Sequence, residues 1–599
     1  MMRSPQSTTL GAPVPPWRLP PPWWQNWRRA DLGGDLTAGM VVAIMLVPQS
    51  LAYAMLAGLP PQVGLLASIL PLIGYALFGS SRVLSVGPAA VTSLMLAQTL
   101  SAWAEPGSTH YLAWSAVLAL GSGILMLLMG SLRLGFLSQL LSRPVVQGFT
   151  VASAVLILVG QLVPLLGGSA RIHTLPDAWA WSVATGTQYE SWAAWLAAMQ
   201  WSLDASIGLG TLACLWLGPA ALTPLLQRIG LGAQQRLIVV RLWPLVVLLG
   251  AAGVVWAVGP HTVQVVGAVA LDGPSAWQSV AAISSASHEV WVDAMKAIAL
   301  ITLVSFVSSV ASAQVYAIRE GERLDADREC LGLAAANIGG ALLGGMAVSG
   351  GLSRTVVNHA AGARSPLAGV ITAVILAVGL LVLLPGLAYL PKSALAAVII
   401  AAVVNLVEWR ALRQAWRYDK GDAWAFVVTA VGVLLVGFDV GIGAGLTWSL
   451  AVMVWRHSQP HIAEVGRVPG TEHFRNVERY EVEQLPGVIV LRVDESLDFT
   501  NIQRVEAGLC QRIRQRCEAV DVVLLLSAVN HLDLSAVQTL LELDRALADQ
   551  GKRLYLAEIK GPVMDRLKAC RLDRQFEGRI FLSAQHAWDA LLEVARRRA

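Results

Sequence analysis

Two short apolar segments open with glycine-rich sequence and contain residue types that could bind an anion. They are residues 86–102 and 350–363, and the second contains Arg354. The first turn of a helix has backbone N–H groups without partners, and the helix dipole makes that end electropositive. Two such helix starts aimed at one point inside a membrane would offer an anion a cage of neutral donors. The simpler alternative is that both segments are short or tilted spans of a helical bundle.

The composition places these segments in a membrane protein. The 599-residue chain is 55% hydrophobic and 14% charged, whereas soluble proteins carry roughly a quarter charged residues. Charged residues are scarce between residues 34 and 457 and are common after residue 470. This distribution predicts a cytoplasmic N-terminal segment at 1–33, a transmembrane domain at 34–457 and a soluble domain at 470–599. The net charge is +4 without a basic stripe, so nucleic acid is not an expected partner.

Apolar runs predict about fourteen spans. A helix that crosses a bilayer needs about 20 mostly apolar residues. Such runs lie at 34–57, 62–79, 110–131, 144–166, 191–219, 238–259, 292–318, 328–348, 364–385, 388–407, 422–437 and 440–457. The two glycine-opened segments complete the set, and each is third in its half of the series. This arrangement is typical of transporters built from inverted repeats, in which broken helices meet near the middle of the membrane.

Basic residues predict the orientation of the spans. If the N-terminus is cytoplasmic, the inner loops contain residues such as Arg82 and Arg319, whereas outer loops 103–109 and 260–290 contain neither Lys nor Arg. Positive residues collect on the cytoplasmic side of membrane proteins. Arg171 is the exception. An even number of spans places the C-terminus inside too, so we expect a multi-pass membrane protein with both termini in the cytoplasm.

Five motifs follow one another along the chain. The first two are VPQSLAYA at 47–54 and GLPPQVGL at 58–65, and the first short segment opens with SVGPAAV at 85–91. The other two are GGLSRTVVN at 350–358 and LPKSALAA at 390–397. Together they resemble the sulfate permease (SulP) family, the bacterial branch of the family that contains pendrin and prestin, in which the last three motifs open spans three, ten and twelve. The resemblance implies that the membrane is a bacterial inner membrane.

The resemblance implies a fold and an activity. The fold would be a membrane all-α domain of about fourteen helices in a 7+7 inverted repeat, followed by a cytoplasmic α/β domain of the STAS type. Spans 1–4 and 8–11 would form a core that slides against a gate formed by the other spans, in an elevator-type mechanism. The family is usually homodimeric. The implied activity is secondary active or facilitated transport of an inorganic anion, sulfate by default, with bicarbonate, chloride or a dicarboxylate as alternatives.

The resemblance also implies an anion site. It places there residues on spans one, three, eight and ten, which are Gln49, Tyr53, Gly87, Pro88, Ala89, Ser308, Leu352, Ser353 and Arg354. Gln49 can donate from its amide, and Tyr53 offers an apolar ring as a wall. Pro88 suits a first helical turn, where no N–H is needed, so span three is expected to start at Gly87–Pro88.

Arg354 has two interpretations. A charge inside a membrane costs at least ~2.5–3.5 kcal/mol, so it indicates a function, here the attraction of the substrate. The alternative is a structural cation that pairs with backbone carbonyls between core helices. Asn358 and His359, which follow on the same segment, are expected to pack or to form hydrogen bonds.

Span eight departs from the family pattern. The family commonly has a glutamate in the sequence Phe-Val-Glu-Ser, or an aspartate in sodium-coupled bicarbonate carriers, but this chain has Ser308 at that position. A buried carboxylate is the usual group that binds H⁺ or Na⁺ together with the substrate. Its loss favours exchange or uncoupled movement over symport. Alternatively, another group provides the coupling, or the alignment slips by one residue.

Strands and helices alternate after residue 487, which predicts an α/β sheet. The sequence from Asp533 to Ala536 resembles the Asp-Ser-Ser-Gly loop of STAS domains, in which Ser535 occupies the position that is phosphorylated in anti-sigma-factor antagonists. Asp533 and Ser535 are therefore candidate regulatory residues. The alternative for Ser535 is a helix N-cap.

The sequence contains no enzyme signature, and we expect neither an enzyme nor a cofactor. No Walker motif, HExxH or GxSxG occurs, and the 5 cysteines lack metal-ligand spacing. The expected partners are a small inorganic anion, the bilayer and a second copy of the chain. Two other functions stay open. One is a nucleobase carrier, which has the same fold, and the other is a membrane-anchored signalling scaffold in which the STAS domain is the active part.

Overall fold

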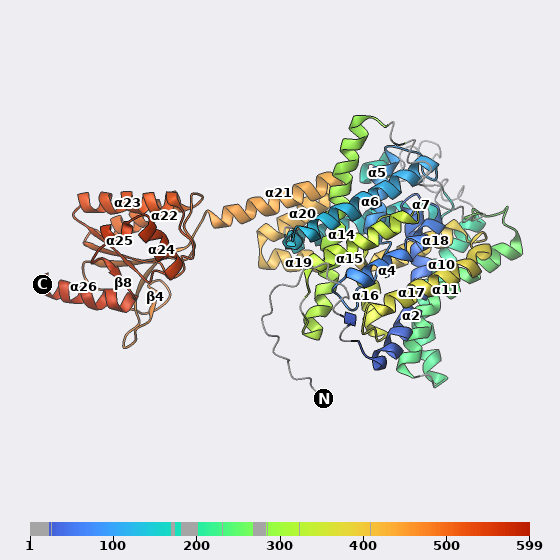
Figure 1. Cartoon of the computed structure of the whole chain (residues 1–599), viewed down its shortest axis with the longest axis horizontal. Helices are drawn as coiled ribbons and strands as arrows, with labels where there is room; N and C mark the ends of the chain where they lie inside the picture. The colour runs from blue at the N-terminus through green and yellow to red at the C-terminus, as the bar shows by residue number, and fades with distance from the viewer. Residues whose placement is uncertain are drawn as a thin grey trace. The chain divides into compact units, whose positions relative to one another are not determined.

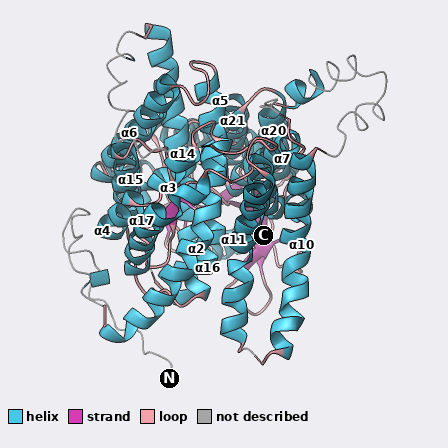
Figure 2. Cartoon of the chain, turned by 90° about the vertical axis from the view of Figure 1, so that its right-hand side faces the viewer, coloured by secondary structure: helices cyan, strands magenta, loops and turns pink. Residues whose placement is uncertain are grey.

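The computed structural model describes residues 23–24, 27–139, 141–168, 174–180, 202–230, 232–267, 283, 286–322, 324–407 and 409–598. The chain divides into two compact units, Met1–Trp448 and Ser449–Ala599 (Figure 1). The first unit is built almost entirely of helices (Figure 2). Residues 1–22 of the predicted N-terminal segment and Arg171, the exception to the charge rule, lie outside the described residues.

The helices of the first half correspond to the predicted spans. They are α2 (Leu32–Leu56), α3 (Pro61–Leu66), α4 (Leu70–Phe78), α5 (Ala90–Ser101), α6 (Thr109–Ser131), α7 (Arg143–Leu165), α10 (Leu203–Arg228) and α11 (Ala233–Val258). The span predicted at 62–79 is divided into α3 and α4. The span predicted at 191–219 begins outside the described residues, and its described part is α10.

The second half repeats this pattern. Its helices are α14 (His288–Glu320), α15 (Ala326–Leu342), α16 (Leu352–Ala360), α17 (Leu367–Leu387), α18 (Lys392–Val403), α19 (Trp409–Tyr418), α20 (Lys420–Leu435) and α21 (Phe438–His457). Among the described residues of the whole chain, 8 helices are long and apolar enough to cross a membrane.

One predicted span is shorter than expected. The run at 388–407 forms only the 12-residue helix α18 and a 3₁₀ turn, Val404–Leu406. The chain before α18 is extended, because Pro391 pairs with Val265 in an isolated antiparallel bridge and the Lys392 N–H donates to the Gln264 carbonyl at 2.9 Å. A long-range backbone contact therefore delays the start of this helix until Lys392.

Helices of the two halves pack against each other. α15 packs on α4 and α6, α17 packs on α2, and α20 packs on α7. Small residues allow this close approach, as in other membrane helix bundles. A Cβ atom at Gly148 would lie 2.5 Å from the backbone oxygen of Phe426, so only glycine allows α7 and α20 to meet there.

A two-stranded sheet lies inside this helical unit. Strand β1 (Val86–Gly87) pairs antiparallel with β2 (Ser349–Gly350), with Val86 opposite Gly350 and Gly87 opposite Ser349. All four residues are buried. Buried backbone groups need hydrogen-bond partners, and these two extended segments provide partners for each other. The pairing brings together the chain immediately before α5 and the chain immediately before α16.

The second unit contains a six-stranded sheet in the order β4-β3-β5-β6-β7-β8. Strands β5 (Val488–Val493), β6 (Asp521–Leu525), β7 (Arg553–Ala557) and β8 (Ile580–Phe581) are parallel. Strands β3 (Ile462–Arg467) and β4 (Phe474–Asn476) add to one edge in antiparallel fashion. The helices of this unit are α22 (Ile502–Gln515), α23 (Leu534–Asp549), α24 (Gly561–Ala569), α25 (Leu572–Gln575) and α26 (Ala584–Arg598). The predicted alternation of strands and helices is confirmed.

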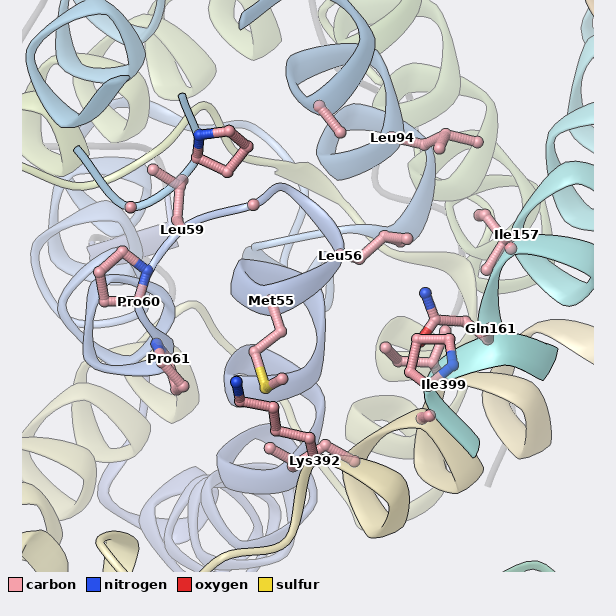
Figure 3. Close-up of a pocket in the computed structure, with 18 of the residues that line it drawn as sticks. Met55, Leu56, Leu59, Pro60, Pro61, Leu94, Ile157, Gln161, Lys392 and Ile399 are labelled. Carbon is pink, nitrogen blue, oxygen red and sulfur yellow. The ribbon is translucent and has the colours of Figure 1, made fainter. Parts of the chain in front are cut away.

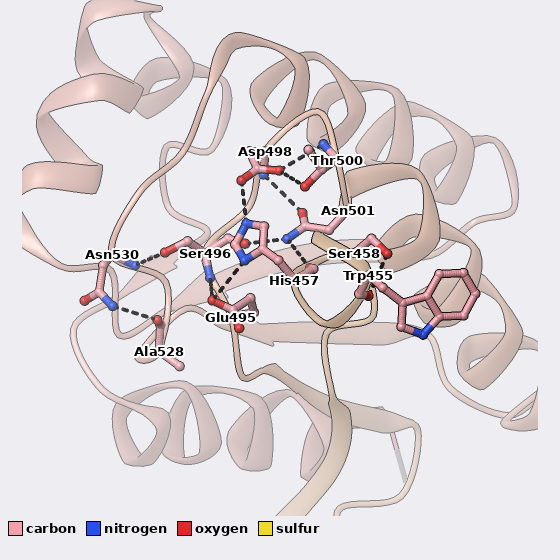
Figure 4. A network of polar contacts seen from close by, with 10 residues as sticks. All are labelled: Trp455, His457, Ser458, Glu495, Ser496, Asp498, Thr500, Asn501, Ala528 and Asn530. Carbon is pink, nitrogen blue, oxygen red and sulfur yellow. Dashed lines mark hydrogen bonds and ion pairs between the residues drawn. The ribbon is translucent and has the colours of Figure 1, made fainter. Parts of the chain in front are cut away.

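A polar network ties the end of α21 to a loop of this sheet (Figure 4). His457 Nε2 lies 2.7 Å from Oδ2 of Asp498, and His457 Nδ1 lies 3.6 Å from Oε1 of Glu495. The Asn501 amide donates to the Ser496 carbonyl at 2.8 Å. The segment that leads into the sheet is therefore held by side chains from the β5–α22 loop.

Candidate anion-binding site

The two predicted broken helices begin beside each other. The β1–β2 pairing holds Gly87 and Ser349 side by side, and the Gly351 N–H donates to the Ser85 carbonyl at 3.1 Å. Helix α5 starts three residues after Gly87, and α16 starts two residues after Gly350. The expected meeting of residues 86–92 with 350–356 is thus present in the structure.

Both helix starts lack a capping side chain. The N-cap residues are Ala89 and Gly351, both with extended backbone, and neither provides a side-chain hydrogen bond to the first turn. Ordinary helices fill these positions with Ser, Thr, Asp or Asn, which accept hydrogen bonds from the free N–H groups. Here those first-turn groups keep their donor capacity, and the two helix dipoles place positive ends at the same location.

The start of α5 differs from the prediction. Gly87 and Pro88 were expected in the first helical turn, but α5 begins at Ala90. The reason is the pairing of Gly87 with Ser349, which keeps this part of the chain extended. The start of α16 at Leu352 agrees with the prediction.

Arg354 is held by backbone carbonyls. Its side chain is buried, at 2% exposure, and its NH2 donates to the carbonyls of Gly87 and Ser349 at 3.1 and 3.2 Å. NH1 donates to the Pro88 carbonyl, whereas Nε has no partner. These contacts correspond to the structural interpretation of this arginine. Among the described residues no carboxylate forms an ion pair with Arg354, and its positive charge lies beside the starts of both helices.

The other predicted site residues surround this point. Helix α2 packs against both α5 and α16 and contributes Gln49, which is half-buried, and Tyr53, which is buried and interacts electrostatically with Arg354. Ala89 is half-buried, and Leu352 and Ser353 are exposed at the first turn of α16. Gly87 and Pro88 are buried and contribute carbonyls rather than N–H groups.

Span eight contacts the site through the serine next to the predicted one. Ser309 accepts a hydrogen bond from the Gly350 N–H at 2.7 Å and donates to the Ser305 carbonyl at 2.5 Å. Ser308 is half-buried and donates only along its own helix, to the Ser305 carbonyl at 3.2 Å. The sequence analysis missed Ser309, and its adjacency to Ser308 was the available signal.

Two buried carboxylates were also missed. Asp35, at 0% exposure, accepts hydrogen bonds from the Arg364 and Ser365 N–H groups at 2.7 and 3.0 Å. Glu329, also at 0% exposure, accepts from the Tyr75 hydroxyl at 2.8 Å and from the Ser81 N–H at 2.7 Å. Both lie in the first turn of their helices and hold loops of the other half of the chain, so their role is to join the repeats.

The N-cap interpretation of Ser535 is wrong. Helix α23 begins at Leu534, and Asp533 is its N-cap, accepting from the Ala536 N–H at 2.8 Å. The second Asp533 oxygen accepts from the Phe499 N–H at 2.8 Å. Ser535 is exposed in the first turn of α23. Asp533 takes the cap because its carboxylate reaches two N–H groups from outside the helix.

Comparisons with known proteins follow the same division of the chain. The Sulfate permease family model matches residues 32–429, and the STAS domain model matches residues 479–587. Sulfate transporter 4.1, chloroplastic, of Arabidopsis thaliana is 33% identical over 524 residues, covering 85% of this chain and 72% of the relative. A "Probable sulfate transporter" of Mycobacterium tuberculosis is 31% identical over 575 residues, covering 95% of this chain and 96% of the relative.

A solved structure shares the fold. It is the murine solute carrier 26 family member A9 anion transporter in the inward-facing state, with a TM-score of 0.80 and 20% identity. The match covers 96% of this chain and 93% of that chain. The predicted fold, a helical anion-transporter domain followed by an α/β STAS domain, is therefore confirmed. The family model covers more than half of the sequence, and this chain belongs to the sulfate permease family.

Proposed function

We propose that this chain carries a small inorganic anion, sulfate in the first instance, across a membrane by binding it between the starts of α5 and α16. The observation that carries the proposal is the β1–β2 pairing, which places two uncapped helix starts together beside the Arg354 charge. The family and the sulfate transporters among its relatives support sulfate as the cargo. Bicarbonate, chloride and a dicarboxylate are the alternatives.

Each residue of the site has a role in this proposal. The first-turn N–H groups after Ala89 and Gly351 donate to the anion, and Gln49 adds an amide donor. Tyr53 forms an apolar wall. Arg354 holds the two strands through their carbonyls and supplies a positive field. Binding by neutral donors lets the anion leave again, because no full ion pair must be broken.

The molecule as a whole works as a membrane carrier without a catalytic step or a cofactor. In this proposal residues 34–457 carry the anion, and the core slides against the gate within a homodimer in a bacterial inner membrane. Residues 470–599 and both termini lie in the cytoplasm, and Ser535 is a regulatory position. Because Ser308 stands where the family has an acid, the movement is exchange or uncoupled flux.

Reconstitution into liposomes tests the proposal. The full chain should take up radiolabelled sulfate, and the same vesicles should be tested with bicarbonate and chloride, each with and without a pH gradient. Uptake of sulfate without dependence on the pH gradient is the expected result. A signalling scaffold or a nucleobase carrier would give no flux of any of the three anions, and uptake driven by protons would refute the proposed lack of coupling.

A further inference from the structure

A cavity lies beside the helices that form the anion site. Its volume is about 540 Å³, and it is lined on one side by α2, α3, α5 and α6 and on the other by α7 and α18. In the proposed topology the lining loops 58–60 and 106–107 face away from the cytoplasm, so the cavity opens on the outer side. Core and gate helices both contribute to its wall.

The cavity is lined by one cation and by amides. Lys392 is the single charged side chain among the described lining residues, which also include Gln62 and Gln161. Figure 3 shows Lys392 next to Met55, whereas Gln161 lies across the cavity on α7. The Lys392 ammonium and the amides of Gln62 and Gln161 make no hydrogen bond or ion pair within the described part of the chain, so their donors are available to a ligand. The amide of a third lining residue, Gln264, already donates to a backbone carbonyl at 2.9 Å.

An acidic group lies behind the wall next to Lys392. Asp204, on α10, interacts electrostatically with Lys392, but its carboxylate accepts a hydrogen bond from the Gln264 N–H at 3.0 Å. It is 9% exposed and does not line the cavity. Asp204 therefore holds the segment after α11 that pairs with the start of α18, and it makes no hydrogen bond to the Lys392 ammonium within the described part of the chain.

The cavity and the proposed anion site share two helices. Leu94 on α5 lines the cavity, and it lies four residues after Ala90, a distance of about 6 Å along a helix axis. Met55 and Leu56 line it from α2, two and three residues after Tyr53. An anion in the cavity is thus one helical turn from the start of α5 along a wall that both sites share.

We propose that this cavity is an outer capture site for the transported anion, with Lys392 as its electrostatic residue. The inference rests on the proposed transport function and adds a second binding position to it. A positive charge in a low-dielectric recess raises the local concentration of anions and their rate of entry. Lys392 selects negatively charged solutes at the outer site. The anion is then bound for transport at the starts of α5 and α16.

Two measurements test this site in the full chain. In liposomes, Lys392→Gln should raise the KM for sulfate by about tenfold with little change in the maximal rate, and Lys392→Arg should restore it. Lys420→Gln is the matched control, because Lys420 is the first residue of α20 as Lys392 is of α18. An unchanged KM for Lys392→Gln would overturn the inference.

The second measurement does not depend on transport. An amine-reactive reagent should modify Lys392 more slowly when sulfate is present, as followed by peptide mass spectrometry, whereas modification of Lys420 should not change. Protection without flux would support the capture site and refute the transport proposal. Flux without protection and without a KM effect would refute the capture site and leave the transport proposal standing.

Discussion

Arg354 joins parts of the molecule that are far apart in sequence, since its contact with the Pro88 carbonyl spans 266 residues. A planar guanidinium can reach several carbonyls at once and keeps its charge. Here it reaches Gly87 and Ser349 on the two paired strands. The same side chain therefore fixes the position of both helix starts and makes their surroundings electropositive, so the two interpretations of this residue are compatible.

The geometry of these contacts predicts that lysine cannot replace Arg354. Arg354→Lys keeps the charge but cannot span both strands, and each carbonyl left without a partner costs roughly 1–3 kcal/mol. We expect Arg354→Lys and Arg354→Gln to lower thermal stability in detergent and to abolish most sulfate uptake. Arg82→Gln is the control, because its exposed ion pair with Glu322 contributes about 0–1 kcal/mol. Full uptake by Arg354→Lys would show that charge alone suffices.

Ser308 allows a gain-of-function test. Ser308→Glu restores the acid of the family pattern at a half-buried position, so uptake should become dependent on an inward proton gradient. Ser308→Ala should leave uptake unchanged. Ser309→Glu tests the alignment, because it should instead damage the protein by removing the hydrogen bond to Gly350. Proton dependence in Ser309→Glu, but not in Ser308→Glu, would show that the alignment slips by one residue.

At the level of elements, packing between the two repeats depends on glycines at helix crossings. Gly148→Ala would place a Cβ atom 2.5 Å from the Phe426 carbonyl oxygen, and α7 and α20 would have to separate. We expect a loss of roughly 1–3 kcal/mol in stability, measured by thermal unfolding in detergent. Gly210→Ala on α10 is the control, since nothing lies within 4 Å of its Cβ position. Equal stability of the two variants would contradict this role.

The loop that receives α21 should be sensitive to acid. Burial raises the pKa of Asp498, but hydrogen bonds from Thr500 and His457 outweigh it and hold this pKa below its ordinary value. A carboxyl with a depressed pKa stabilises the fold above its unfolded pKa of about 3.9, and the stabilisation is lost as the pH falls through the folded value. The protection of the 495–501 amides from hydrogen exchange, relative to their intrinsic exchange rates at each pH, should therefore fall below about pH 4. Asp498→Asn should show fast exchange already at neutral pH.

The elements could be predicted from the sequence to different degrees. Apolar runs and glycine-rich openings are local signals, so the spans, both broken helices and the alternation of strands and helices after residue 487 were found. Strand β3, at Ile462–Arg467, was missed and lies before the predicted start of the STAS domain. Contacts between distant segments leave no local signal. The pairing of Gly87 with Ser349 moved the start of α5 to Ala90, and the bridge between Val265 and Pro391 shortened α18. The carbonyl partners of Arg354 depend on the same long-range pairing.

At the scale of the whole molecule, the cavity lies between helices of the proposed core and helices of the proposed gate. Helix α5 contacts α7, and α2 contacts α18. In an elevator, the core must move past the gate while its own helices keep their contacts. A link across this boundary should therefore have a different effect from a link inside the core.

Paired cysteines test that difference. Leu94→Cys with Ile157→Cys places thiols on α5 and α7, which both line the cavity, and a short bifunctional thiol reagent should stop sulfate uptake. Ser50→Cys with Ser68→Cys is the core control, because these hydroxyls lie 2.7 Å apart, and its disulfide should leave uptake intact. Both pairs require a background without the exposed native cysteines. Uptake that survives the first link means that the anion passes without the core sliding against the gate, and uptake lost with the second means that the core itself must change shape.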